Sequence, residues 1–173
     1  MRFPDPSILF LGIDPGVTAG GWGILDYRGT LVDCGRWGTW ERVRRYLGQI
    51  KIATIEMIQV RSDDTMEKMF SRSAMIENYG FWQGVCGGAG VSAKPVHPRT
   101  WKKYFGLNLR PGELKVLKRG GADKIKAEMS LSKARALWPT APLKYLKDNG
   151  VADGLLIAEF GRARHRQNLF EGA

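Results

Sequence analysis

The sequence predicts a single α/β domain, and three observations lead to that class. Three short apolar runs of the kind that form buried strands come before any long helical pattern. Strand and helix patterns then alternate through the middle of the chain, and helical patterns fill its last third. The 173 residues suffice for one domain with a substantial core, and the chain shows no repeat and no interdomain linker, so residues 1–173 are expected to form one domain.

The expected strands are apolar runs bounded by turn residues. The first is continuously apolar and ends in an acid, as a central strand buried on both faces often does. Pro15-Gly16 and Arg28-Gly29 mark the turns between the first three strands, which are expected to form an antiparallel meander. The five expected strands cover residues 7–14, 20–26, 30–37, 52–56 and 91–96.

The expected helices show apolar residues at helical spacing. The longest pattern, Thr65–Val85, has apolar residues on more than one face, which is more than packing on a sheet requires. Pro98 suits the first position of a short helix that ends near Phe105. The expected helices cover residues 40–50, 65–85, 98–105, 123–138 and 150–161.

Charge and composition narrow the classes of function. Lysine and arginine total 27 against 17 acids, a formal net charge of +10 that favours a polyanionic partner, first of all nucleic acid. Two distant cysteines exclude a disulfide framework and a zinc ribbon. The apolar stretch 7–13 is too short to span a membrane and has no cleavage pattern behind it, so we expect a cytoplasmic protein without a membrane partner.

Three acids stand in otherwise apolar elements. Asp14 ends the first strand, Glu56 ends the strand 52–56, and Asp153 lies in an apolar helical face. If the two strands are adjacent, their acids emerge side by side, and a lone acid on an apolar face is costly without a partner. Taken singly, each acid has an ordinary explanation: Asp14 as a turn residue, Glu56 as a surface acid at a strand end, and Asp153 as an ion-pair partner. Together the three predict a site for divalent metal, since Mg²⁺ prefers carboxylate oxygens.

The same three motifs give the chain its resemblance to a known family. Three segments resemble the three motifs of the RuvC-type Holliday-junction resolvases, which belong to the ribonuclease H-like nuclease superfamily. They are Leu11–Gly16 with the glycines of 20–23, the pair Ile55-Glu56 before a long helix, and Val151–Ala158. The resemblance runs from about Leu9 to His165.

The resemblance implies a ribonuclease H-like fold, a mixed five-stranded sheet flanked by helices, and a homodimer that cuts two opposed strands of a four-way DNA junction. It implies that Asp14, Glu56 and Asp153 are catalytic metal ligands for Mg²⁺, with Mn²⁺ able to substitute. Lys102 and Lys124 fall near family lysines that approach DNA; the alternative for each is a solvated helix charge.

Further DNA contacts are expected from a basic stretch between residues 106 and 121. It looks longer than in many relatives, and its cations would neutralise phosphates. These cations are Arg110, Lys115, Lys118 and Arg119.

The chain departs from the family pattern at two positions. The family usually has an acid or a histidine three residues before the last aspartate, where this chain has Gly150; Asp148 is expected to replace it as a metal ligand, with Asn149 as the competitor. The family often carries an aromatic wedge three residues after the strand-end glutamate, where this chain has Gln59. Met57, Ile58 and Phe70 are possible replacements or core residues.

The sequence therefore predicts a metal-dependent endonuclease that resolves four-way junctions by paired nicks. Two alternatives stay open, a less selective nuclease for forks and flaps and a catalytically weak nucleic-acid-binding module. The dimer is expected on the Thr65–Val85 helix, where small residues such as Ser73, Ala74 and Gly80 permit close approach. Alternatively, the second face of that helix packs within its own chain.

Overall fold

A five-stranded mixed sheet lies at the centre of the protein in a computed structural model that describes residues 7–58, 65–109 and 121–171. The first three strands form the expected antiparallel meander, and the other two run parallel to the first. The strands are β1 (Leu9–Asp14), β2 (Gly21–Asp26), β3 (Leu31–Arg36), β4 (Ile50–Glu56) and β5 (Ser92–Val96), in the spatial order β3-β2-β1-β4-β5. The predicted mixed five-stranded sheet is confirmed.

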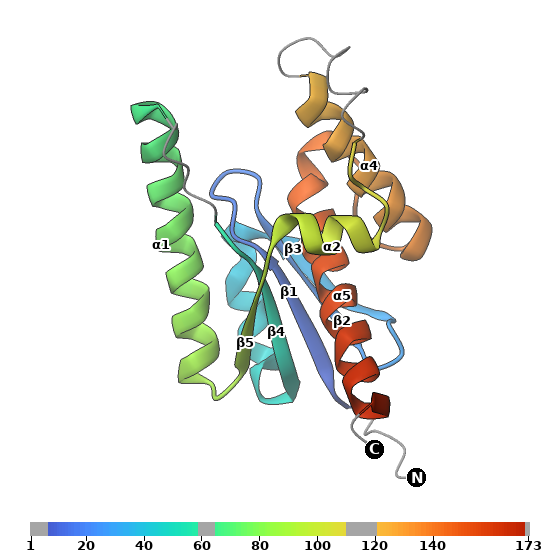
Figure 1. Cartoon of the computed structure of the whole chain (residues 1–173). Coiled ribbons are helices and arrows are strands. Elements are labelled where there is room, and N and C mark those ends of the chain that lie inside the picture. The colour runs from blue at the N-terminus through green and yellow to red at the C-terminus, as the bar shows by residue number, and fades with distance from the viewer. Residues whose placement is uncertain (1–6, 59–64, 110–120, 172–173) are drawn as a thin grey trace.

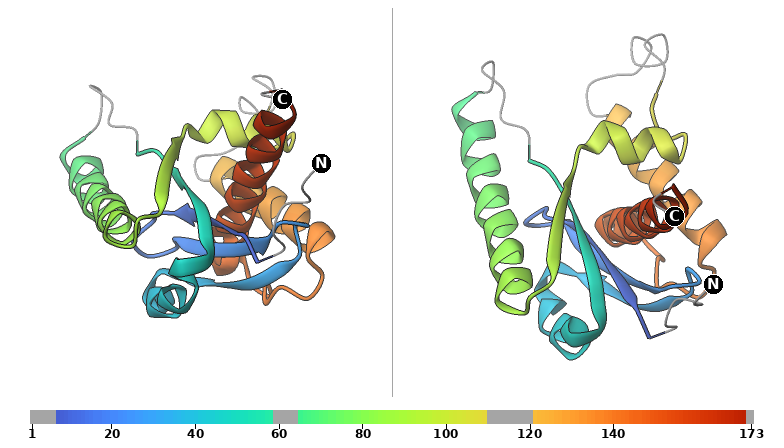
Figure 2. Two further views of the ribbon diagram at one scale, coloured as in Figure 1. Left: turned by 90° about the horizontal axis from the view of Figure 1, so that it is seen from below. Right: turned by 60° about the horizontal axis from the view of Figure 1, so that its bottom comes forward.

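Helices cover both faces of this sheet (Figures 1 and 2). One apolar core joins the sheet to α5 and α4, and the other joins it to η1 and α1. The short α2 crosses the end of the sheet at which β1 and β4 finish (Figure 1). The helices are η1 (Trp37–Gln49), α1 (Met66–Gly88), α2 (Pro98–Tyr104), α4 (Gly121–Leu137), η2 (Leu146–Asp148) and α5 (Asn149–Glu171).

Two helices differ from expectation. The predicted helix 40–50 is instead the 3-10 segment η1, which has a kink at Thr39. The last helix was expected to end at Gly161 but continues to Glu171. Its additional turns are held by tertiary contacts, because Arg162 is buried and the ring of His165 packs against Phe10 with centroids 5.5 Å apart.

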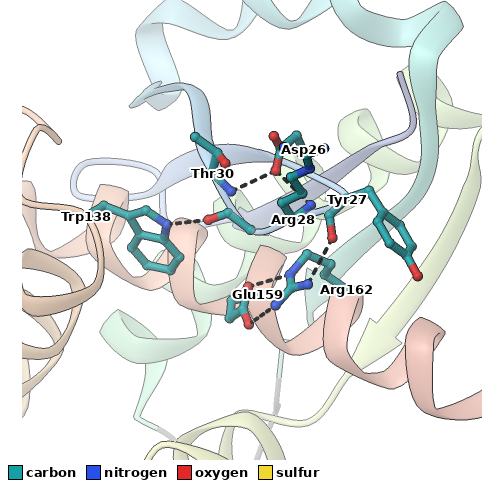
Figure 3. Close-up of polar contacts among 8 residues, drawn as sticks. Asp26, Tyr27, Arg28, Thr30, Trp138, Glu159 and Arg162 are labelled. Carbon is teal, nitrogen blue, oxygen red and sulfur yellow. Dashed lines mark hydrogen bonds and ion pairs between the residues drawn. The ribbon is translucent and has the colours of Figure 1, made fainter. Parts of the chain in front are cut away.

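A polar cluster fixes α5 to the turn between β2 and β3 (Figure 3). Arg162 pairs with Glu159 and donates a 3.0 Å hydrogen bond from Nη1 to the carbonyl oxygen of Tyr27. The indole of Trp138, just after α4, donates a 2.9 Å hydrogen bond to the carbonyl oxygen of Gly29. Because both helices are anchored here, α5 has a defined position along the sheet.

The close packing of α5 on the sheet requires a glycine at position 12. An added Cβ at Gly12 would lie 2.1 Å from the carbonyl oxygen of Gly154 and from the amide nitrogen of Ala158. Only glycine permits two backbones to approach so closely. The contact brings the first turns of α5, with Asp153, next to the end of β1.

The N-terminal half of α1 exposes large apolar side chains. Met66 and Phe70 are 66% and 71% exposed, whereas Trp82 near the other end of the helix is fully buried in the core. The second face of this half-helix is therefore not covered by any described part of the chain. In the described ranges, no helix is both long and apolar enough to cross a membrane.

Candidate active site

Asp14 and Glu56 lie side by side at one edge of the sheet. They end the parallel neighbours β1 and β4, in which Ile13 pairs with Ile55. The backbone amide of Gly16 donates a 3.1 Å hydrogen bond to Oδ1 of Asp14, so the turn that follows β1 holds this carboxylate. The predicted adjacency of the two strand-end acids is confirmed.

Asp153 joins this edge from the second turn of α5. It accepts a hydrogen bond from the side chain of Ser130 on α4, but its Oδ1 is buried and has no hydrogen-bond partner in the described part of the chain. An unpartnered buried carboxylate oxygen is costly, and in native proteins it indicates a missing ligand or an unusual protonation state.

The three carboxylates perturb one another. Burial raises the pKa of Asp14 well above its ordinary value, and the negative charges of Glu56 and Asp153 raise it further. Burial also raises the pKa of Glu56, and it raises that of Asp153 to about 6. Three acids whose charged forms are all disfavoured form an electrostatically unfavourable cluster unless cations neutralise it.

Lys102 is the cation that faces this cluster. Its ammonium lowers the pKa of all three carboxyl groups, partly offsetting the effect of burial. The lysine follows Trp101 on α2, and its Nζ lies 4.9 Å from the centre of the Trp101 ring. The predicted Lys102 thus contributes positive charge directly at the acidic site.

Trp101 holds Glu56 in place. Its indole Nε1 donates a 2.6 Å hydrogen bond to Oε2 of Glu56, and the ring is fully buried. Residue 101 was not singled out from the sequence. A tryptophan in the first turns of a helix that follows a strand is too common to indicate a role by itself.

Two cavities adjoin the carboxylates. A cavity of about 210 Å³ between α2, α4 and α5 is lined by Lys102, Ser130 and Asp153, and also by Asp123 and Asn149. A second cavity, of about 440 Å³, adjoins Asp14 between the turn after β1 and residues 74–75 of α1. The site is therefore open on the side of α4 and on the side of α1.

The α1 side is fixed to the turn after Asp14. Asn78, buried in α1, donates a 2.9 Å hydrogen bond from Nδ2 to the carbonyl oxygen of Pro15. This contact sets the position of α1 relative to the acidic cluster, and no sequence pattern indicates it, because the two residues are far apart in the chain.

The donor set fits a hard divalent cation. All three side chains offer carboxylate oxygens, and Oδ1 of Asp153 has no hydrogen-bond partner among the described residues. Within the described residues, no three His, Cys, Asp or Glu side chains lie at separations that would hold one metal ion. A cation between the carboxylates would favour their charged forms.

The structure gives Asp148 another partner than the acidic cluster. Its Oδ1 is paired with the guanidinium of Arg36, and its Oδ2 accepts a 2.8 Å hydrogen bond from the backbone amide of Tyr145. Although burial opposes its ionisation, these contacts lower the pKa of Asp148 below its ordinary value. The expectation that Asp148 is the fourth metal ligand has no support from this geometry, whereas the competitor Asn149 lines the same cavity as Asp153.

A backbone contact explains why position 150 carries glycine. Gly150 and Gly20 form a parallel bridge, and a Cβ at Gly150 would lie 1.6 Å from the carbonyl oxygen of Ala19. An acid or histidine at this position would displace the loop between β1 and β2. The departure from the family pattern is thus a packing requirement of this chain.

The other predicted residues fall in different places. Lys124 is exposed on α4, where Lys126 rather than Lys124 lines the cavity next to Asp153. Met57 is 41% exposed at the end of β4. Ile58 is half-buried and Phe70 is exposed. The other candidates lie outside the described residues: Arg110, Lys115, Lys118, Arg119 and Gln59.

Comparison with solved structures supports the fold. Thermus thermophilus RuvC in complex with a Holliday junction substrate superposes with a TM-score of 0.54 at 14% sequence identity, covering 92% of this chain and 96% of that chain. A second T. thermophilus RuvC structure gives a TM-score of 0.41 at 16% identity, over 91% and 97% of the two chains. No protein family and no curated protein matches the sequence. The chain therefore has the α/β fold of the RuvC nuclease.

Proposed function

We propose that the protein is a metal-dependent DNA endonuclease that cuts four-way junctions. The observation that carries this proposal is the cluster of Asp14, Glu56 and Asp153, three half-buried carboxylates whose charged forms are disfavoured, one of them with a buried oxygen that has no hydrogen-bond partner in the described part of the chain. Clusters of this kind bind pairs of divalent cations in phosphodiester hydrolases. The RuvC fold makes nucleic acid the first substrate to consider, and the net charge of +10 agrees with it.

The carboxylates of Asp14, Glu56 and Asp153 would hold Mg²⁺, with Mn²⁺ as a substitute. The cations would supply Lewis-acid activation of water and stabilise the leaving oxygen. The protein itself orients the ligands, since Trp101 fixes Glu56 and Ser130 fixes Asp153. Lys102 adds a positive charge beside the position at which the negative charge of a phosphodiester would develop.

A homodimer would supply two such sites for two symmetric cuts. The exposed apolar side chains of α1, Met66, Met69, Phe70 and Ile76, offer the surface for a second copy. A two-fold axis beside α1 would relate the two acidic clusters, as paired incision of a symmetric junction requires.

Cleavage of labelled DNA tests the function. A four-way junction, a fork, a flap and a linear duplex are incubated with the protein at equal concentration, with Mg²⁺, with Mn²⁺ and with a chelator. The proposal expects paired nicks in the junction with either metal and none with the chelator. Faster cutting of forks and flaps would assign a less selective branched-DNA nuclease, and metal-independent binding without cutting would assign a binding module.

Light scattering at micromolar concentration tests the dimer. The parent protein should have the mass of two chains, and Phe70→Glu should shift it towards one chain, because a charge at a buried apolar contact is costly. Val32→Glu is the matched control, since Val32 is an exposed apolar residue on the edge strand β3. A parent protein of one-chain mass would remove the dimer from the proposal.

A further inference from the structure

A cavity separate from the acidic cluster lies between the sheet and the second half of α5. It has a volume of about 350 Å³, within the range of small-molecule sites, and is bounded by β4, β5, the start of α2 and α5. Thr100 of α2 lines this cavity, whereas Lys102, two residues further on, lines the cavity beside Asp153. The helix α2 therefore lies between the two.

The side chains at the rim are basic or neutral hydrogen-bonding groups. Lys94 of β5 and Arg164 of α5 supply two cations, and no acid belongs to the described residues that line the cavity. The guanidinium of Arg164 lies 6.0 Å from the centre of the Phe160 ring. Arginine and lysine at the mouth of a concave site are suited to a phosphate group.

Both histidines of the chain line the same cavity, together with Asn168. Burial lowers the pKa of His165, and the positive charge of Lys51 lowers it further, so its imidazole is neutral at pH 7. Neutral imidazole and amide groups hydrogen-bond to polar edges and add no further charge. They complement the cations at the rim.

The floor of the cavity is apolar. Ile52 of β4, Val96 of β5 and Phe160 of α5 line it, and Val96 and Phe160 are buried. An inorganic anion would leave this surface uncovered, whereas a sugar or a base would cover it. The combination of a cationic rim, neutral hydrogen-bonding groups and an apolar floor matches the parts of a nucleotide.

We propose that this cavity binds one phosphorylated nucleoside unit, with its phosphate at Lys94 and Arg164 and its sugar and base over Ile52, Val96 and Phe160. The phosphate could belong to a free nucleotide or to a DNA strand. The inference goes beyond the proposed nuclease function and uses no residue of the acidic cluster.

The two histidines give a direct readout, because every imidazole resonance in the spectrum of the full-length protein reports on this cavity. The protein is titrated in chelator with thymidine 5′-monophosphate, thymidine and inorganic phosphate. We expect saturable shifts of both imidazoles with the monophosphate, and affinity about tenfold weaker for thymidine and for phosphate alone. Because metal is absent, failure of the nuclease proposal would not affect this result.

Charge variants locate the phosphate. Lys94→Gln with Arg164→Gln should weaken binding of the monophosphate by about tenfold or more. The matched control is Lys103→Gln with Arg166→Gln, which removes two exposed cations, one from α2 and one from α5, that do not line the cavity. No saturable shift in the parent at millimolar monophosphate, equal affinity for phosphate or thymidine alone, or equal loss in both double variants would overturn the proposal.

A 5′-phosphorylated trithymidylate separates the two sources of phosphate. If the trinucleotide binds about tenfold more tightly than the monophosphate and is weakened by the same variants, the cavity holds a nucleotide of a DNA strand. If the monophosphate binds as tightly or more tightly, the cavity holds a free nucleotide. Either result supports the cavity as a nucleotide site, and neither depends on cleavage.

Discussion

The indole Nε1 of Trp101 donates a 2.6 Å hydrogen bond to Oε2 of Glu56. This bond joins α2 to the end of β4, and the next residue, Lys102, faces all three carboxylates. The short helix α2 therefore contributes both a ligand-orienting group and a positive charge to the acidic cluster.

Replacement of Trp101 by Phe should shift the pH dependence of cleavage. The hydrogen bond favours the charged form of Glu56, so its loss should raise the pKa of Glu56 and move the acidic limb of the pH profile to higher pH. Because Trp101 orients Glu56, a proposed metal ligand, we also expect the variant to lose about tenfold or more in cleavage rate or in Mg²⁺ affinity.

Trp138→Phe is the matched control for this variant. It removes another indole hydrogen bond, the 2.9 Å contact to the carbonyl oxygen of Gly29, away from the carboxylates. It should lower stability without moving the pH profile. If the Trp101 variant loses stability but keeps the profile of the parent, Trp101 has only a packing role.

Asp153→Asn should stabilise the metal-free protein at pH 7.5. The pKa of Asp153 is raised to about 6 in the folded state, so the folded state binds its proton more tightly than the unfolded state. The stability of the parent therefore falls as pH rises from about 4 through about 6, whereas the variant lacks this dependence. The gain at pH 7.5 is at most about 3 kcal/mol, since one pKa unit corresponds to about 1.4 kcal/mol.

Thermal melts in chelator at pH 4 and pH 7.5 measure this difference. The variant should have the higher melting temperature at pH 7.5 and lose that advantage at pH 4. Glu128→Gln, which removes an exposed acid from α4, should show no such pattern. A variant less stable than the parent at pH 7.5 in chelator would show that burial does not disfavour the charged form of Asp153 enough to affect stability.

Asp148→Asn should change stability, whereas Asn149→Ala should change metal dependence. Asp148 is bound by Arg36 and by the amide of Tyr145, so its variant should lower the melting temperature but keep the Mg²⁺ concentration at half-maximal cleavage. Asn149 lines the cavity with Asp153, so its variant should raise that concentration. The reverse result, with the metal midpoint moved only by Asp148→Asn, would make Asp148 the fourth ligand.

Gly150→Ala should destabilise the protein strongly. Its Cβ would lie 1.6 Å from the carbonyl oxygen of Ala19, a clash that requires movement of the loop between β1 and β2. Gly84→Ala in α1 is the control, since a Cβ there has no neighbour within 4 Å and alanine favours a helix by about 1 kcal/mol. In chemical denaturation, the free energy of unfolding should be lower than that of the parent for Gly150→Ala and higher for Gly84→Ala. Equal stability of the two variants would mean that the bridge between residues 20 and 150 is dispensable.

The sequence predicted those parts of the site that depend on local patterns. Asp14 and Glu56 end apolar runs, and once the runs are parallel neighbours their side chains must emerge together. The partner contacts were not predictable, because Asn78 meets Pro15, and Trp101 meets Glu56, across long stretches of chain. No periodicity or motif encodes such distant pairs.

The length of α5 and the role of Asp148 show the same limit. Gly161 looked like a helix end from local propensity, but Arg162 and His165 beyond it are held by contacts with the β2–β3 turn and with β1. Asp148 was expected to turn towards the metals, and the distant Arg36 at the end of β3 holds it instead. In both cases tertiary contacts override the local signal.

We propose that the carboxylate cluster at the end of β1 cuts DNA with the help of divalent metal. The most direct test is the rate at which Asp14→Asn cleaves a labelled four-way junction at saturating Mg²⁺, measured together with its affinity for the junction in chelator. We expect a rate at least about a hundredfold below that of the parent and an unchanged affinity for the junction. The control variant Glu41→Gln, which removes an exposed acid from η1, should be as active as the parent. A variant that cuts at the parent's rate would contradict the assignment of the site.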